Sequence, residues 1–190
     1  MRSPQRTEIS LARNEMDTGV AARPCRYERW VLVAKHIDAV FARLDDGAAL
    51  ARHMTKRSAA MLGSRLEFVP DPVRSGLGAQ YGWRGRVLGL PVSVEEEVIE
   101  YRPPVAKSWR TTGRPQLIVI ASYTLGFSLR DLGAVTEILM WIDYQLPKSG
   151  WRVLAGRVLG HRYARWCVDR MAHDAVADSG TVARSNGELA

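Results

Sequence analysis

A long stretch of β-type sequence with tight turns is the feature that most constrains the fold of this chain. From Ser64 to Tyr144 the sequence is β in character, and no segment of helical periodicity interrupts it. Turns rich in glycine and proline separate the strand-like segments. Strands joined in this way pair with their neighbours in the chain, which predicts an antiparallel meander.

Six strands are predicted in this stretch. They are Arg65–Val69, Gln80–Leu88, Val92–Tyr101, Ala106–Thr112, Leu117–Phe127 and Ala134–Tyr144. Turns are expected at Gly89–Pro91, Gly113–Pro115 and Arg130–Gly133, and Pro103-Pro104 ends the third strand because proline cannot donate to a ladder. Several of these strands are long, which favours a strongly curved sheet.

Helical patterns flank the β region on both sides. A first strand at Tyr27–Ala34 is followed by apolar residues at helical spacing over Ile37–Leu44, and by a second short helical stretch at Leu50–Met54. One long helix is predicted at Ser149–Ala175, with Ser149 as its N-cap.

The apolar stripe of the long helix shifts at Gly156 and Gly160, which predicts a bend or a close backbone contact there. The folded domain is expected over residues 27–175, between flexible tails at 1–26 and 176–190.

Composition agrees with a single globular domain. The chain has 190 residues, 46% hydrophobic and 25% charged. Its two cysteines, Cys25 and Cys167, form neither a disulfide framework nor a C-x-x-C pair. No apolar run approaches the roughly 18 residues that a membrane span needs, and residues 1–26 lack a secretory signal. A cytoplasmic location is therefore expected.

The positive charge is concentrated in the long helix. The net charge is +7, and residues 148–173 carry six basic residues against Asp169 alone, which leaves five of those seven charges there. One interpretation is a solvated helix face opposite the core. The alternative is a surface for anionic membrane lipid or nucleic acid, although no DNA partner is expected.

The order of elements resembles the START-like, or Bet v 1-like, helix-grip fold. Three stretches carry the resemblance: Val31–Ala34 followed by Ile37–Phe41, Gly78–Gly85, and Val98–Pro104. The sequence is similar in particular to the polyketide cyclase/dehydrase and lipid-transport branch of the SRPBCC superfamily, over roughly residues 28–173. The resemblance implies an α+β fold with two short helices after the first strand. A curved antiparallel sheet would wrap around the C-terminal helix and enclose an apolar cavity for a small hydrophobic ligand.

Strand alternation assigns residues to the inner side of the sheet. On the last strand one face carries no charge, so we assign that face inward, and we treat the other strands and the helix alike. The predicted cavity residues are Tyr81, Trp83, Trp109, Val119, Tyr123, Leu125, Phe127, Ile138, Met140, Ile142, Tyr144, Leu154 and Val158. The alternative is that these side chains fill the interior by packing against one another.

Residues able to carry chemistry are sparse. The four histidines have no metal-ligand spacing, and no nucleophile elbow or phosphate-binding loop is present, so neither metal nor cofactor is expected. Glu96 lies within a glutamate triplet and points opposite to its neighbours. Inward beside Tyr81 it would be a candidate general base with a raised pKa; the alternative is an exposed strand edge that discourages aggregation. His53 is a second candidate, at the cavity mouth or on the surface.

The leading hypothesis is a binder or carrier of a lipid, polyketide, isoprenoid or quinone. The first alternative is an enzyme of the cyclase/aromatase type that uses the same cavity. The second is an interaction protein whose basic helix docks on RNA, a ribosome or a membrane. The sequence assigns no oligomeric state.

Overall fold

The computed structural model describes residues 24–46, 66–70, 76–176 and 181–185. His53 and the predicted helix at Leu50–Met54 lie outside these residues. The strands are β1 (Cys25–Val33), β2 (Leu66–Val69), β3 (Gln80–Val87), β4 (Leu90–Arg102), β5 (Ala106–Gln116), β6 (Ser122–Asp131), β7 (Thr136–Gln145) and β8 (Thr181–Ser185). The helices are α1 (Ile37–Asp45) and α4 (Arg152–Val176).

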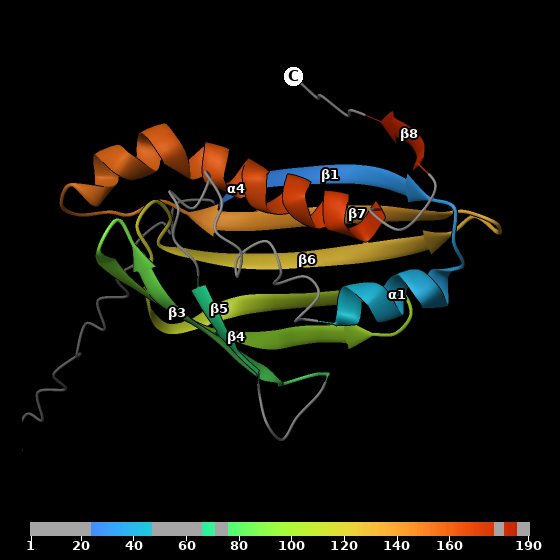
Figure 1. Ribbon diagram of the computed structural model, residues 1–190. Helices are drawn as coiled ribbons and strands as arrows, with labels where there is room; N and C mark the ends of the chain where they lie inside the picture. Colours follow the sequence, from blue (N-terminus) through green and yellow to red (C-terminus); the bar gives the residue numbers. More distant parts are fainter. Residues whose placement is uncertain (1–23, 47–65, 71–75, 177–180, 186–190) are drawn as a thin grey trace, which may run out of the picture.

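All these strands form one curved antiparallel sheet. Their order across it is β2-β3-β4-β5-β6-β7-β1-β8, so consecutive strands from β2 to β7 are neighbours, as a meander requires. Figure 1 shows β2 and β3 running at a steep angle to β6, β7 and β1, and both helices on the same side of the sheet. We call the side that the helices cover the inner face. Strand β8 lies in the predicted C-terminal tail and pairs with β1.

The hairpin between β3 and β4 is tighter than predicted. Leu88 and Gly89 alone make the turn, with φ angles of 51° and 78°, and β4 resumes at Leu90. Two consecutive positive φ angles are typical of a type I′ turn, whose twist matches that of the strands it joins.

The predicted turn at Gly113–Pro115 is wrong, because β5 continues through it to Gln116. Gly113 adopts a φ of 62°, and the pairing of β5 with β4 shifts register at this point. A glycine with positive φ can produce a bulge instead of a reversal, and a proline is tolerated there. The chain reverses later, so residues 117–121 precede β6 and are not strand as predicted.

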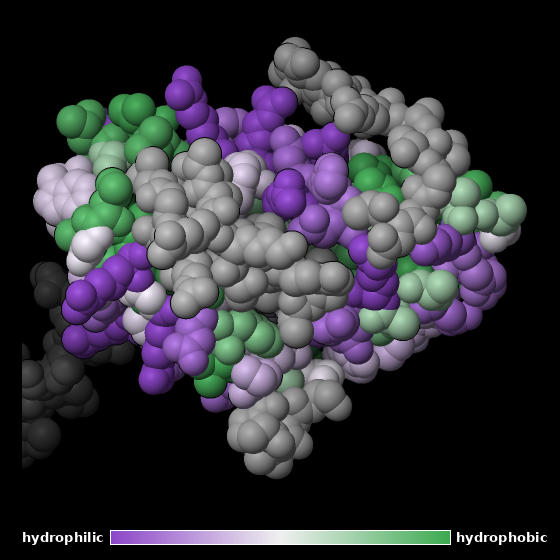
Figure 2. Space-filling view, in the orientation of Figure 1, coloured by the Kyte–Doolittle hydropathy of each residue, from purple (hydrophilic) through white to green (hydrophobic). Residues whose placement is uncertain are grey.

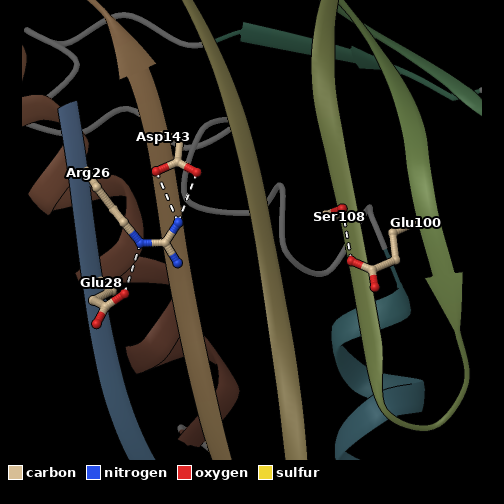
Figure 3. Close-up of polar contacts among 5 residues, drawn as sticks. All are labelled: Arg26, Glu28, Glu100, Ser108 and Asp143. Carbon is tan, nitrogen blue, oxygen red and sulfur yellow. Dashed lines mark hydrogen bonds and ion pairs between the residues drawn. The ribbon is translucent and has the colours of Figure 1, made fainter. Parts of the chain in front are cut away.

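Burial alternates along β7, and its buried residues are those that the sequence predicted to face inward. Ile138, Met140, Ile142 and Tyr144 are buried, whereas the residues between them are partly exposed. The outer face carries polar contacts: Figure 3 shows Arg26 bound to Glu28 and to Asp143, with the helices behind the sheet. On β5 the hydroxyl of Ser108 donates to Glu100 on this outer side.

The two helices pack differently against the inner face. On α1 the predicted apolar positions Ile37, Val40, Phe41 and Leu44 are all buried. Helix α4 begins at Arg152, so Ser149 is not its N-cap as predicted. Its buried residues are small near its start and larger further on: Gly156, Gly160, Ala164, Cys167, Val168, Met171, Ala172 and Ala175. These residues lie along one continuous side of the helix, so the predicted shift of the apolar stripe is wrong. Trp151, Leu154 and Val158 are exposed and do not belong to the packed side.

Two glycines let α4 lie directly on the chain segments that precede β6 and follow β7. A Cβ at Gly156 would meet Pro147 Cδ at 2.7 Å and the carbonyl oxygen of Val119 at 3.0 Å. A Cβ at Gly160 would meet Leu146 Cδ2 at 2.6 Å and the same carbonyl oxygen at 3.0 Å. The close backbone contact predicted from these glycines is confirmed.

Replacing Gly156 by alanine tests this contact, because the contact decides whether the substitution raises or lowers the free energy of unfolding. Helix propensity alone would stabilise the protein by up to about 1 kcal/mol, whereas overpacking costs about 1–3 kcal/mol. We expect Gly156→Ala to lower the free energy of unfolding in urea denaturation. Arg157→Ala, at an exposed position in the same turn, is the control and should change little. A Gly156→Ala protein more stable than the wild type would contradict the contact.

Candidate functional site

The site is centred on Glu96, which lies on the inner face of β4. Strand β4 pairs with β3 on one side and β5 on the other, so it is not an edge of the sheet. Glu96 is 4% exposed, whereas Glu95 is exposed and Glu97 is partly exposed. The interpretation of the triplet as an exposed edge is therefore wrong for Glu96.

Side chains from three neighbouring strands donate hydrogen bonds to this carboxyl. The indole N–H of Trp83 on β3 donates to Glu96 Oε2 at 2.9 Å. The hydroxyl of Tyr123 on β6 donates to Oε1, and Trp109 on β5 supplies a second indole N–H. Sheet pairing explains the convergence, because Tyr81 and Thr111 lie opposite Glu96 on its two neighbouring strands.

Burial dominates the electrostatics of the site. Desolvation raises the pKa of Glu96 above its ordinary value, although the three donors and the nearby Lys107 act in the opposite direction. Desolvation also raises the pKa of Tyr123 well above its ordinary value, and the neighbouring Glu96 carboxyl adds to this. The proton of Tyr123 therefore stays on the phenol and remains available to the carboxyl.

Helix α4 extends this polar group with Tyr163 and Cys167. Burial raises the pKa of Tyr163 well above its ordinary value, and the Tyr163 and Cys167 side chains are hydrogen-bonded to each other. Burial raises the pKa of the Cys167 thiol to about 12. The two α4 side chains and the Glu96–Tyr123 pair influence one another electrostatically, so sheet and helix both contribute to one site.

A buried lysine lies next to this group. Lys107 on β5 is 3% exposed, and its Nζ donates to Asp45 Oδ1 at 2.7 Å and to the Asp45 carbonyl oxygen at 3.3 Å. The rings of Tyr81, Tyr101 and Trp109 lie within 6.0 Å of Nζ. Asp45 is the last residue of α1, so this ion pair fixes the end of that helix to the sheet.

The structure gathers four of the predicted cavity residues around the carboxyl: Tyr81, Trp83, Trp109 and Tyr123. Six others are buried within the apolar core, namely Leu125, Phe127, Ile138, Met140, Ile142 and Tyr144. Whether these ten line a ligand cavity stays a prediction. Val119 lies in the segment before β6 and is partly exposed, so the strand parity used to place it does not apply.

Leu154 and Val158 were wrongly assigned to the interior. Leu154 is 70% exposed and Val158 is 59% exposed, on the outer side of α4. That prediction assumed that the side of the helix with the largest apolar side chains is the packed side. Gly156 and Gly160 instead mark it, because backbone contact requires residues without a side chain.

Two groups of site residues were not predicted, although the strand and helix periodicity of the sequence places them on the inner face. Lys107 is two residues before Trp109 on the same strand, so both share one face. Tyr163 and Cys167 continue the helical spacing that begins at Gly156 and Gly160. A lysine on an inward strand face is the sequence signal for this part of the site, since lysine is rarely buried without a partner.

Within the part of the chain that the structure describes, no group of three or more His, Cys, Asp or Glu side chains could hold a metal ion. Among the described helices, none has the length and hydropathy of a membrane span.

Comparison with known proteins places the fold. No protein-family model matches the sequence, and no curated protein matches it by sequence similarity. Solved structures do match. The protein TTHA0849 from Thermus thermophilus has a TM-score of 0.60 at 14% identity, over 82% of this chain and 100% of that one. The Zhui aromatase/cyclase from Streptomyces sp. R1128 has a TM-score of 0.53 at 13% identity, over 80% and 93%.

A third match is norcoclaurine synthase from Thalictrum flavum in complex with dopamine and hydroxybenzaldehyde. It has a TM-score of 0.57 at 14% identity, over 90% of this chain and 95% of that one. This chain has the helix-grip fold. The fold that the resemblance implied is therefore confirmed, with a curved antiparallel sheet against a long C-terminal helix. At these identities the matches establish the fold of the helix-grip chain and leave its function to its own residues.

The two cysteines should differ sharply in reactivity, because the thiolate is the reactive form. With a pKa of about 12, Cys167 is deprotonated in only about one molecule in ten thousand at pH 8. Cys25 is exposed. We expect iodoacetamide to label the native protein once, and peptide mass spectrometry should place the label on Cys25. A Cys25→Ser protein should remain unlabelled until denaturant is added; rapid labelling of its native form would show that Cys167 is not enclosed.

The raised pKa of Glu96 predicts a pH-dependent contribution to stability. Because the folded state holds this proton more tightly than the unfolded state, the contribution is complete below an unfolded pKa of about 4.3. It is lost as the pH rises through the raised folded pKa. Glu96→Gln cannot ionise, so its unfolding free energy minus that of the wild type should increase between pH 4.5 and 8 in urea titrations. A difference that stays constant or decreases would mean that the pKa of Glu96 is not raised.

Proposed function

We propose that this protein binds a small hydrophobic molecule between the inner face of the sheet and α4, with the Glu96–Tyr123 pair as its polar anchor. The observation that carries the proposal is the buried Glu96 carboxyl, which three aromatic donors surround in an apolar interior. Burying a carboxyl costs free energy even when donors surround it, and buried titratable groups with shifted pKa values cluster at functional sites.

The exposure of the inner aromatic residues supports a space beside this pair. Tyr81, Trp83, Tyr123 and Tyr163 all keep part of their surface accessible, although they lie on the side that the helices cover. For Tyr123 and Tyr163, desolvation is nevertheless the largest cause of the raised pKa. Accessible surface on such desolvated groups favours a hollow next to them over complete packing.

The chemistry of the site suggests the kind of ligand. Aliphatic and aromatic side chains complement a hydrophobic body, and the Glu96–Tyr123 pair complements one hydroxyl or carbonyl group. Lipids, polyketides, isoprenoids and quinones all fit this description. The bound aromatic molecules named for norcoclaurine synthase support the use of this fold for such ligands. The cytoplasmic location of the protein remains a prediction.

Binding of the neutral dye N-phenyl-1-naphthylamine tests the location of the ligand. Tyr123→Trp should lower the affinity for the dye at least about tenfold, or about 1.4 kcal/mol in binding free energy, because the larger ring occupies the space next to Glu96. The matched control is Thr124→Trp, since the next residue on β6 points to the outer face and should leave binding unchanged. Absence of saturable dye binding by the wild type, or equal binding by the two variants, would contradict the proposal.

A second candidate function is a cyclase-type enzyme, which the hydrogen bond between Tyr123 and a Glu96 of raised pKa favours. A carboxyl of raised pKa that is hydrogen-bonded to a phenol is suited to general acid–base chemistry. The sequence candidate His53 lies outside the described residues and stays a candidate. If a poly-β-keto thioester is cyclised, Glu96→Gln should slow turnover by about 100-fold or more. The control Glu95→Gln changes the exposed neighbour and should keep full activity; equal rates for both variants would remove Glu96 from catalysis.

A further inference from the structure

Large apolar side chains are exposed on the outward side of the first half of α4 and at Trp151, the residue just before the helix. Trp151 is 58% exposed, Leu154 70%, Val158 59% and Leu159 45%. At about 100° per residue, Trp151, Leu154 and Val158 share one side of the helix, opposite the packed glycines. Figure 2 shows hydrophobic residues gathered over this end of α4, at the upper left of the view. Large contiguous apolar patches are rare on the surfaces of monomeric soluble proteins, and they usually mark an interaction site.

Basic side chains surround these apolar residues, and acidic ones are missing. Lys148, Arg152, Arg157 and Arg162 are all exposed, and none of them takes part in the ion pairs of the described residues. Between Asp143 and Asp169 the sequence has no aspartate or glutamate. Figure 2 shows strongly hydrophilic residues further along the same helix. The positive charge is therefore not neutralised locally.

We propose that this docking face binds an anionic lipid bilayer. The docking face consists of Trp151, Leu154, Val158 and Leu159 together with Lys148, Arg152, Arg157 and Arg162. A helix that lies in a membrane interface places its apolar residues among the acyl chains and its cations at the headgroups. The helix would lie along the surface, because its opposite side packs through Gly156 and Gly160 on the chain segments around Val119 and Pro147.

Other partners fit this face less well. A second copy of the chain would bring the same cations close to one another, and like charges across an interface are unfavourable. A nucleic acid would satisfy the cations through its phosphates. It would leave Leu154 and Val158 in water, because aliphatic side chains have no role in phosphate contacts. Only a surface that is both anionic and apolar complements both sets of residues.

Cosedimentation with lipid vesicles tests the proposal with the full chain. Two vesicle types are compared: phosphatidylcholine alone, and phosphatidylcholine with phosphatidylglycerol. One variant removes charge, Arg157→Gln with Arg162→Gln, and another removes apolar surface, Leu154→Ser with Val158→Ser. The matched controls lie elsewhere on the surface: Arg84→Gln with Arg86→Gln, and Leu77→Ser with Leu132→Ser. Thermal unfolding checks that each variant is folded.

The wild type should bind the anionic vesicles, with an affinity that falls as salt is added, and should bind neutral vesicles weakly. Loss of each arginine should cost about fivefold in affinity, so the charge variant, which lacks two, should bind about 25-fold more weakly. The serine variant should also lose binding, and both controls should keep it. The proposal is overturned if the wild type does not bind, or if each variant binds as its control does. It is also overturned if the serine variant converts a dimer to a monomer, or if RNA binds and vesicles do not.

This inference does not depend on the proposed ligand. Vesicle binding is measured without dye or ligand, so a protein that takes up no hydrophobic dye could still dock. A protein that binds dye but no vesicles would keep its ligand site and lose only the docking face.

Discussion

The burial of one carboxyl group organises the interior of this protein. Glu96 lies on the inner face of β4, and its hydrogen bonds require Trp83, Trp109 and Tyr123 from three neighbouring strands. These side chains share the inner face of the sheet and converge on one carboxyl. A buried carboxyl without such donors would oppose folding by several kcal/mol, since a charged group loses its hydration there. The positions of these three aromatic residues are therefore tied to the burial of Glu96.

The approach of α4 determines what is left inside and what is left outside. Gly156 and Gly160 bring the start of the helix onto the segment before β6, and the larger residues that follow pack on the core. The same rotation of the helix turns Leu154 and Val158 outward beside the arginines. The ligand site and the docking face that we propose are thus opposite sides of one helix. If both proposals hold, the protein would receive its hydrophobic ligand at a surface where such molecules accumulate.

Local patterns predicted the fold well and the site in part. The alternation along β7 and the spacing of Ile37, Val40, Phe41 and Leu44 depend on nearest neighbours, and both predictions were confirmed. The prediction of a turn at Gly113–Pro115 was wrong because a glycine followed by a proline is compatible with a bulge as well as a chain reversal. Pairing with β4 decides between the two. The prediction of the packed face of α4 was wrong because a helix that packs through glycines has no large apolar residues at the contact. The donors to Glu96 come from β3, β5 and β6, and which of their residues meet the carboxyl depends on the register between strands, which no local pattern contains.

Native mass spectrometry of gently purified protein is the most direct test of the central claim that sheet and helix hold a hydrophobic guest beside Glu96. The account predicts a population whose mass exceeds that of the chain by one small molecule, and that molecule should leave on collisional activation. The excess mass should also be absent from Tyr123→Trp, whose added ring takes the same space. A wild-type spectrum with only the bare chain, which stays unchanged after incubation with hydrophobic small molecules, would contradict the account.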